Sequence, residues 1–239
     1  MESGTESGTE RARVAATAEL VGERVRLEPL ELRHHDGLCD AVREGSLWEL
    51  AVTIVPHPDE VRGFIEDAVA ARAEGTQIPY ATVDAATGRV VGSTRLMMIN
   101  TTHRRLEIGW TFLAASRQGT GVNAEAKLLM LTHAFEAMGM NRVELLTDVR
   151  NAKSRAAIER LGATQEGVMR HHMIMRDGWI RDTALYAITR PEWPEVKRAL
   201  EARRSAGPAP GPPPGPPARR RGAGETTQKN KNPHYLKGI

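Results

Sequence analysis

Residues 116–135 read SRQGTGVNAEAKLLMLTHAF, and this segment joins a glycine-rich turn to an amphipathic helix. Gly119 and Gly121 permit backbone conformations that allow another molecule to approach the main chain closely. After them, Leu128 and Leu131 recur at the spacing of a helix that buries one face. The first N–H groups of a helix have no intrahelical partner and attract anions. We therefore expect this turn to bind a phosphate group.

Two common phosphate-binding loops do not fit the spacing. A P-loop requires four residues between its glycines, followed by Lys and then Ser or Thr. A dinucleotide-binding turn requires a third glycine three residues after the second, where this chain has Ala124. The phosphate ligand must therefore belong to another class of cofactor or cosubstrate.

The sequence on both sides of this segment predicts a mixed α/β fold in the order β-α-α-β-β-β-α-β-α-β-β. Hairpins alternate with β-α-β crossovers, which argues against a purely parallel doubly wound sheet. A single Asp177-Gly178 turn is expected to join the last two strands. The predicted strands are 24–30, 79–84, 89–99, 104–113, 142–148 and a hairpin within 166–189, and the predicted helices are 33–49, 59–74, one from the glycine turn to Gly139, and 151–161.

Composition divides the chain into one domain, 21–204, with a tail at each end. Residues 1–20 repeat ESGT and are rich in small polar residues, and residues 205–239 begin with a Pro/Gly-rich linker, so both tails are expected to be disordered. The net charge of +3 comes from the C-terminal tail, which has six Lys and Arg against one Glu, whereas the two signs balance between 21 and 204. A charge-balanced domain makes nucleic-acid binding the least favoured function.

No apolar run is long enough for a membrane span and no secretory signal is apparent, so we expect a cytoplasmic protein that does not enter membranes. Cys39 is the single cysteine, which excludes an intrachain disulfide and a cysteine-based metal cluster. It is expected to be a small buried apolar residue in a helix. No metal site is predicted.

The glycine turn and its flanks resemble the GNAT superfamily of N-acetyltransferases. The turn Arg117-Gln118-Gly119-Thr120-Gly121-Val122 resembles the pyrophosphate loop Arg/Gln-x-x-Gly-x-Gly/Ala of that superfamily, either with Gln118 leading the pattern or shifted onto the two glycines. Residues 106–170, LEIGWTFLAASRQGTGVNAEAKLLMLTHAFEAMGMNRVELLTDVRNAKSRAAIERLGATQEGVMR, resemble its RimJ/RimL-like branch, which includes ribosomal-protein N-terminal acetyltransferases. The resemblance covers roughly 21–193.

This resemblance implies a GNAT acyl-CoA N-acyltransferase fold, acetyl-CoA as cosubstrate, a primary amine as acceptor and a plausible homodimer. A protein N-terminal amine is the first-choice acceptor by analogy. Main-chain N–H groups of 118–123 and a mobile Arg117 would hold the diphosphate, and a backbone amide within 110–113 would stabilise the oxyanion where the strand splays, helped by Gly109. The residues expected to bind the cosubstrate are Phe112, Leu113, Arg117, Gln118, Gly119, Thr120, Gly121, Val122, Asn123, Asn151 and Ser154.

Glu107 is the predicted general base, because it corresponds to the carboxylate of the family strand that precedes the loop. A purely structural outward-facing glutamate is the alternative interpretation. The tyrosine that protonates the thiolate in many members is replaced here by Ile158, so Ser154 is the predicted donor to sulfur. Asn151 would contact pantetheine or cap a helix, and Tyr186 is a more remote alternative acid.

Adjacent His171 and His172 are not expected to bind a metal together, because neighbouring strand residues point to opposite faces. One of them could line the acceptor site. Small amines, antibiotics and lysine side chains remain open as acceptors, since a fold does not fix a substrate. A second class of function is a non-catalytic acyl-CoA sensor, which the missing tyrosine favours.

Overall fold

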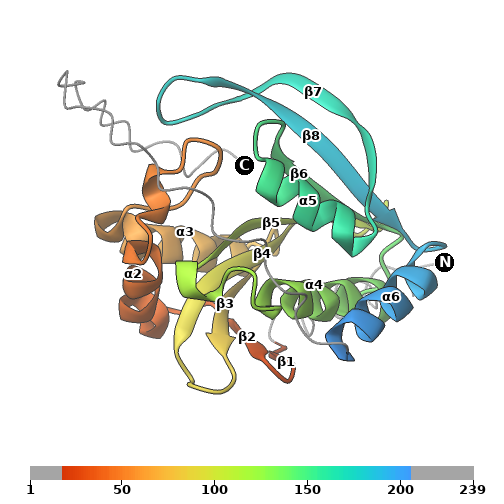
Figure 1. Ribbon diagram of the computed structural model, residues 1–239, viewed down its shortest axis with the longest axis horizontal. Helices are drawn as coiled ribbons and strands as arrows, with labels where there is room; N and C mark the ends of the chain where they lie inside the picture. Colours follow the sequence, from red (N-terminus) through yellow and green to blue (C-terminus); the bar gives the residue numbers. More distant parts are fainter. Residues whose placement is uncertain (1–17, 206–239) are drawn as a thin grey trace, which may run out of the picture.

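The computed structural model describes residues 18–205, which form an eight-stranded sheet with helices on both faces (Figure 1). The predicted N-terminal tail lies outside these residues except for its last three, and the C-terminal tail lies outside them beyond Ser205. No described helix combines the length and the apolar character that crossing a bilayer requires.

The elements follow the predicted order, with a short strand added before them and a helix after them. The strands are β1 Leu20–Val21, β2 Val25–Pro29, β3 Ile78–Asp84, β4 Val90–Asn100, β5 Arg105–Leu113, β6 Arg142–Asp148, β7 Thr164–Ile174 and β8 Ile180–Thr189. The helices are α2 His35–Arg43, α3 Val61–Ala73, α4 Val122–Thr132, α5 Ala152–Leu161 and α6 Trp193–Ser205. Short helical turns are η1 Leu32–His34, η2 Leu47–Glu49, η3 Pro58–Glu60, η4 Ala115–Arg117 and η5 His133–Ala137, the last a π-helical turn that extends α4.

The strand order across the sheet is β1-β2-β3-β4-β5-β6-β8-β7. Every neighbouring pair is antiparallel except β5 and β6, which are parallel and joined by the crossover helix α4. This arrangement confirms the predicted mixed sheet. The predicted hairpin turn is also confirmed, since Gly178 has a positive φ of 81° between β7 and β8.

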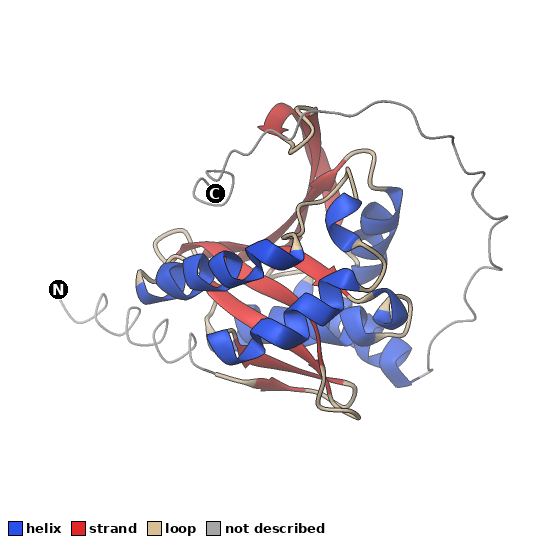
Figure 2. Ribbon diagram, turned by 90° about the vertical axis from the view of Figure 1, so that its left-hand side faces the viewer, coloured by secondary structure: helices blue, strands red, loops and turns tan. Residues whose placement is uncertain are grey.

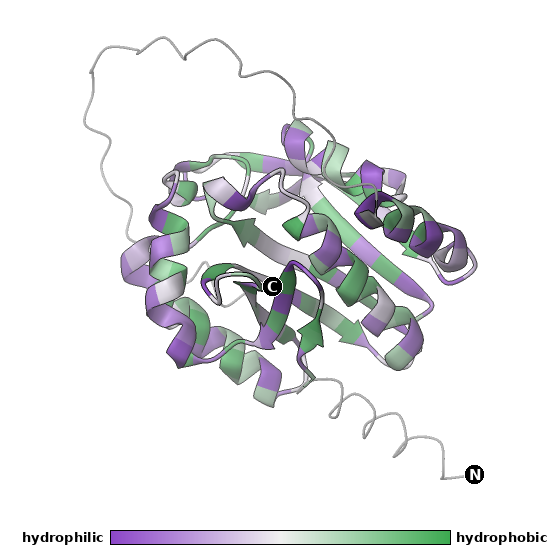
Figure 3. Cartoon of the chain, turned by 60° about the horizontal axis from the view of Figure 1, so that its bottom comes forward, coloured by the Kyte–Doolittle hydropathy of each residue, from purple (hydrophilic) through white to green (hydrophobic). Residues whose placement is uncertain are grey.

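Two hydrophobic cores lie on opposite faces of the sheet. Helices α2 and α3 cover one face of β2–β5, and Figure 2 shows the molecule from this side. Leu38 of α2 and Phe64 of α3 belong to the same core as Phe112 of β5. Helices α4, α5 and α6 pack on the other face, where Leu106, Tyr186 and other apolar side chains form the larger core. Hydrophobic and hydrophilic residues interleave along these elements (Figure 3), as amphipathic helices and half-buried strands require.

The predicted helix over 33–49 is wrong at both ends. It begins as η1, and α2 ends at Arg43 because Gly45 and Ser46 have positive φ values of 85° and 48°. A left-handed residue cannot continue an α-helix, and η2 then restarts a short turn. Cys39 is 5% exposed in α2, as predicted for a small buried side chain.

Glu125 ties the start of α4 to the beginning of β2. Its carboxylate is 3% exposed and accepts hydrogen bonds from the main-chain N–H groups of Glu23, Arg24 and Val25, at 3.1, 2.7 and 3.1 Å. These three donors have no other partner among the described residues. The contact anchors the glycine turn to the sheet, because Glu125 lies in the first turn of the helix that follows it.

Replacing Glu125 with Ala is expected to lower the free energy of unfolding by about 3–5 kcal/mol, because three buried donors lose a charged acceptor. Chemical denaturation monitored by circular dichroism measures this change. Glu66→Ala is the control, since Glu66 is exposed on α3 and its contact with Arg62, at 3.8 Å, should contribute under about 0.5 kcal/mol. Equal stability losses in the two variants would contradict the anchoring role.

Candidate active site

The turn before α4 presents a row of main-chain N–H groups without partners. Gly119 and Gly121 have positive φ values of 78° and 90°, and Gly121 is the N-terminal cap residue of α4. From Gly119 through Ala124, no main-chain N–H donates to a described residue, and the first bonded amide of the helix is that of Glu125, which donates to the carbonyl of Gly121 at 3.0 Å. Six consecutive donors at a helix start form a site suited to an anion.

The remainder of the turn is held by the protein itself. The Gln118 main-chain N–H donates to the carbonyl of Ala115 at 3.2 Å. The sequence predicts this N–H among the free donors, and the structure shows that it is not one of them. The Gln118 side chain donates to the carbonyl of Leu113 at 2.8 Å and accepts from Lys153. The Thr120 hydroxyl donates to the carbonyl of Arg117 at 2.8 Å. These contacts fix the shape of the turn.

Arg117, which the sequence predicts as a mobile cation for the diphosphate, is paired within the protein. Its guanidinium forms an ion pair with Asp84, with 3.1 Å between Nε and Oδ2. Asp84 also accepts from the main-chain N–H and the hydroxyl of Thr87, at 2.9 and 2.8 Å, and these bonds and Arg117 hold its pKa below the usual range despite its burial. Sequence reasoning did not find this pair, because the end of β3 lies 33 positions earlier in the chain.

Between β5 and β6, the parallel ladder stops near its beginning. The two strands pair only from Arg105 to Glu107 on β5 and from Arg142 to Glu144 on β6. Beyond Glu107, no described strand pairs with that edge of β5, and β6 continues against β8 to Asp148. The main-chain groups on this edge of β5 are therefore available to a ligand.

A β-bulge interrupts β5 within the predicted splay. The register with β4 shifts between Ser93/Phe112 and Arg95/Gly109, and Trp110 has a positive φ of 49°. An ideal Cβ at Gly109 would lie 2.7 Å from the Met97 sulfur and 2.9 Å from a Glu107 carboxylate oxygen, so a larger residue there would displace the ends of these two side chains. The predicted distortion of this strand is confirmed, while the amide that would meet an oxyanion stays a prediction.

Glu107 stands where β5 and β6 separate. Leu106 and Ile108 belong to the core under α4, so Glu107 points to the face that carries α2 and α3. Burial raises its pKa to about 7, the neighbouring Glu144 acts in the same direction, and Arg181 opposes both. Glu107 accepts no hydrogen bond from a described residue. A carboxylate with a pKa near 7 is suited to accept a proton at neutral pH.

The start of α5 holds the other predicted catalytic residue. The Asn151 side chain accepts from the Ser154 main-chain N–H at 3.0 Å, which makes Asn151 the N-cap of α5. The Ser154 hydroxyl makes no hydrogen bond within the described chain, so it can donate to a ligand. Tyr186 is fully buried, and its hydroxyl contacts Glu159, Arg155 and Gln165. Because these residues engage the Tyr186 hydroxyl, it has no free proton to donate to a ligand.

The two adjacent histidines lie on a distorted part of β7. The β7–β8 register shifts between Met169 and Met173, and His171 has a positive φ of 51°. His172 lies 3.1 Å from the hydroxyl of Thr183, and burial together with Arg181 lowers its pKa. Among residues 18–205, no three His, Cys, Asp or Glu side chains are grouped to hold a metal ion.

Lys127 and Arg95 are buried cations that sequence reasoning missed. The Lys127 ammonium, 5% exposed, donates to Thr111 at 2.6 Å and to Thr94 at 3.2 Å, and burial lowers its pKa to about 7. It therefore supports the bulge from the α4 side. The Arg95 guanidinium stacks on Phe64, with 4.3 Å to the ring centre, and supports the opposite side. The sequence does carry one indication of the buried lysine, because Lys127 lies on the apolar face of its helix.

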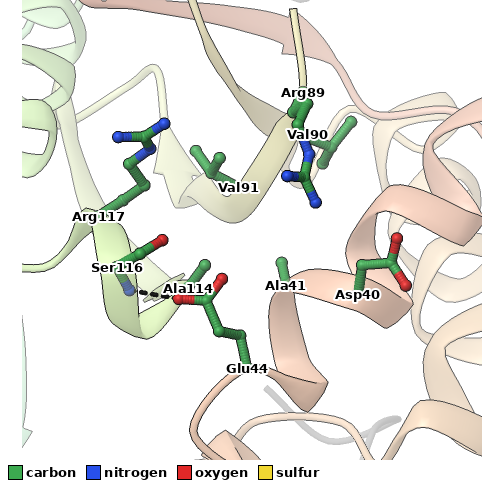
Figure 4. A pocket seen from close by; sticks show the side chains of 9 residues that line it. All are labelled: Asp40, Ala41, Glu44, Arg89, Val90, Val91, Ala114, Ser116 and Arg117. Carbon is green, nitrogen blue, oxygen red and sulfur yellow. Dashed lines mark hydrogen bonds between the residues drawn. The ribbon is translucent and has the colours of Figure 1, made fainter. Parts of the chain in front are cut away.

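A small cavity lies beside the turn, between α2, β4 and η4 (Figure 4). Its volume is about 40 Å³, and the Ser116 main-chain N–H donates to Glu44 at 2.5 Å across one side. This space suits a few water molecules and not a nucleotide. The residues that line it are Asp40, Ala41, Glu44, Arg89, Val90, Val91, Ala114, Ser116 and Arg117.

A mixed sheet that splits at its one parallel pair, next to a helix that begins with free amides, is the arrangement expected of an acyl-CoA N-acyltransferase. The Acetyltransferase (GNAT) domain family matches residues 24–164. A GCN5-related N-acetyltransferase from Brucella melitensis has a crystal structure with 30% sequence identity and a TM-score of 0.69, covering 78% of this chain and 85% of that one. The chain belongs to the GNAT acetyltransferase family.

One curated relative and one further solved structure are also similar to this chain. The protein named 'Putative ribosomal N-acetyltransferase YdaF', from Bacillus subtilis (strain 168), is 33% identical over 106 residues. This match covers 44% of this chain and 57% of YdaF. Mycobacterium smegmatis RimJ, solved in complex with CoA-disulfide, shares the fold at 23% identity and a TM-score of 0.66, covering 74% of this chain and 88% of that structure. The match to the curated relatives thus spans a little over half of their length.

Proposed function

We propose that this protein transfers the acetyl group of acetyl-CoA to a primary amine, with the N-terminal amine of a protein as the first-choice acceptor. Family membership supports the reaction class, and the name of YdaF supports a ribosomal protein as the acceptor. The observation that carries the proposal is the row of six unpartnered main-chain N–H groups from Gly119 to Ala124.

These N–H groups fit the diphosphate of acetyl-CoA. Each charge-assisted hydrogen bond contributes about 1.5–3 kcal/mol, so a few of them together account for firm binding. No described atom lies within 4 Å of the position that a Cβ would occupy at Gly119, so the backbone there is open to close approach. The free edge of β5 would bind the amide groups of the pantetheine arm in the manner of an added strand. Acetyl-CoA supplies the activated thioester.

Glu107 would accept the proton, directly or through water, as the acceptor nitrogen forms its bond to the thioester carbon. A main-chain N–H within the bulge at residues 110–113 would donate to the oxyanion that this attack creates. When the carbon–sulfur bond breaks, the Ser154 hydroxyl would donate a hydrogen bond to the departing thiolate, which takes up a proton from solvent. The products are an N-acetylated amine and CoA, and the proton on Glu107 returns to solvent.

The proposal is tested with the full chain, acetyl-CoA and a library of peptides, small amines and lysine side chains, scored by mass spectrometry. We expect acetylation at peptide α-amino groups. Acetylation confined to small amines or lysines would contradict the acceptor class, and tight acetyl-CoA binding with no transfer to any acceptor would identify a sensor domain instead.

The pH dependence of kcat/KM is expected to reflect the ionisation of Glu107. Because its pKa is raised to about 7, the base form disappears below neutral pH, and this loss alone should lower kcat/KM about tenfold per pH unit there. The acceptor amine also titrates, with a reference pKa of about 8 for an α-amino group. Two acceptors with different amine pKa values separate the effects: a limb near pH 7 that stays fixed between them belongs to Glu107, and its absence would contradict this assignment.

A further inference from the structure

Arg181 is a buried cation without a direct partner. It belongs to β8 and is 9% exposed. Its Nε atom is buried without a hydrogen bond, and the guanidinium makes no hydrogen bond and no ion pair within 4.0 Å to any residue in 18–205. Burial lowers its pKa, which Asp148 and Glu107 partly offset. Buried charges are normally paired, so this arginine is incomplete without a further group.

The sheet register places Arg181 on the face that carries the proposed general base. Thr183 pairs with Asp148 and Ala187 pairs with Glu144, so the odd-numbered residues of β8 share the face of these carboxylates. Glu144 pairs in turn with Glu107. Arg181 therefore lies on the same face of the sheet as the proposed general base, on the far side of the separation between β5 and β6.

The two carboxylates nearest in effect to Arg181 have other roles, since Asp148 is bonded to Arg150 and Glu107 is the proposed general base. Asp148 is fully buried and accepts three side-chain hydrogen bonds from Arg150, at 2.8, 3.1 and 3.3 Å. Arg150 itself stacks on Trp179, with 4.2 Å to the ring. Glu107 must stay available to take a proton from the acceptor. His172 cannot act as a counter-ion, because imidazole is either neutral or positively charged, and burial and Arg181 lower its pKa and so favour the neutral form.

We propose that Arg181 binds a carboxylate of the acceptor and so selects amines that carry a carboxylate close to the reacting nitrogen. An arginine side chain has only donors, so its partner must be an acceptor group, and an anion both satisfies the donors and compensates the buried charge. The carboxylate is either the side chain of an acidic residue next to a peptide N-terminus or the α-carboxylate of an amino acid. This inference rests on the proposed function and specifies its substrate.

Matched acceptors test the proposal without disturbing the protein. The full chain is assayed at saturating acetyl-CoA with C-terminally amidated peptides that begin Ser-Glu or Ser-Gln, and with glycine against glycinamide. We expect a preference of about 10- to 100-fold in kcat/KM for the carboxylate-bearing member of at least one pair, mostly through KM, as for one charge-assisted contact. The pair that shows the preference identifies the source of the carboxylate.

Variants then assign the preference to Arg181. Arg181→Gln should abolish it, Arg181→Lys should retain only a small part because the planar fork is lost, and Arg170→Gln, at an exposed arginine of β7, should keep it. Acetyl-CoA affinity and the unfolding temperature report whether each variant is folded. Equal acetylation within both pairs by the wild type, or a preference that survives in Arg181→Gln, would overturn this inference alone. Absence of transfer to every acceptor would overturn the proposed function and this inference with it.

Discussion

Replacing Glu107 with Gln is expected to lower kcat by about 100- to 10,000-fold while the Kd for acetyl-CoA stays unchanged. The amide has nearly the same shape as the carboxylate but cannot accept a proton from the attacking amine. Glu107 is the last residue of β5 that pairs with β6, and it does not belong to the glycine turn, so cosubstrate binding should be independent of it. Steady-state kinetics with a peptide acceptor, together with calorimetric titration of acetyl-CoA, measure both quantities.

Glu166→Gln provides the matched control for this substitution. Glu166 is an exposed residue of β7 whose carboxylate pairs with Arg142 at 2.5 Å, and its loss should leave kcat within about twofold because surface ion pairs contribute little. A Glu107→Gln enzyme with wild-type kcat would show that another group, or solvent, takes the proton. The purely structural interpretation of Glu107 would then hold.

Replacing Gly121 with Ala is expected to raise the Kd for acetyl-CoA about 100-fold. At a φ of 90° a side chain is strained by about 1–3 kcal/mol, and the added Cβ would lie 3.1 Å from a guanidinium nitrogen of Arg24. Relief of this strain rotates the peptide planes of the turn and misdirects their N–H groups. The loss of about one strong charge-assisted hydrogen bond corresponds to this change in affinity.

Gly75→Ala separates the loss of binding from general strain. Gly75 also has a positive φ, 74°, and no atom within 4 Å of the added Cβ, but it follows α3 and lies outside the turn. Both variants should lose similar stability, and only the variant at Gly121 should lose affinity, as measured by calorimetric titration. Unchanged acetyl-CoA affinity in Gly121→Ala would contradict the role of this turn.

Local patterns predicted the parts of the fold that depend on neighbouring residues. The glycine turn, the amphipathic α4, the Asn151 cap and the Asp177-Gly178 hairpin turn each follow from a few adjacent side chains. The same approach extended the first helix through Ser46, because the hydrophobic spacing continues there while the backbone does not. Helix α6 was missed because the Pro-rich segment after it dominated the composition of that region.

Contacts between distant strands could not be read from the sequence. Arg117 pairs with Asp84, Lys127 donates to Thr111, and Arg181 comes to share a sheet face with Glu107 only when the sheet has set its register. Glu107 and Ser154 stay the predicted catalytic residues, and the structure adds buried basic side chains, Lys127, Arg95 and Arg181, that no sequence motif indicated.

The most direct test of the central claim is a measurement on the turn itself. The amide signals of Gly119 and Gly121 are followed by heteronuclear NMR while the full chain is titrated with CoA and, separately, with pantetheine, which lacks the diphosphate. We expect the largest shifts at Gly119 through Ala124 with CoA, and none of comparable size there with pantetheine. Saturating CoA that leaves these amide signals in place would contradict the account.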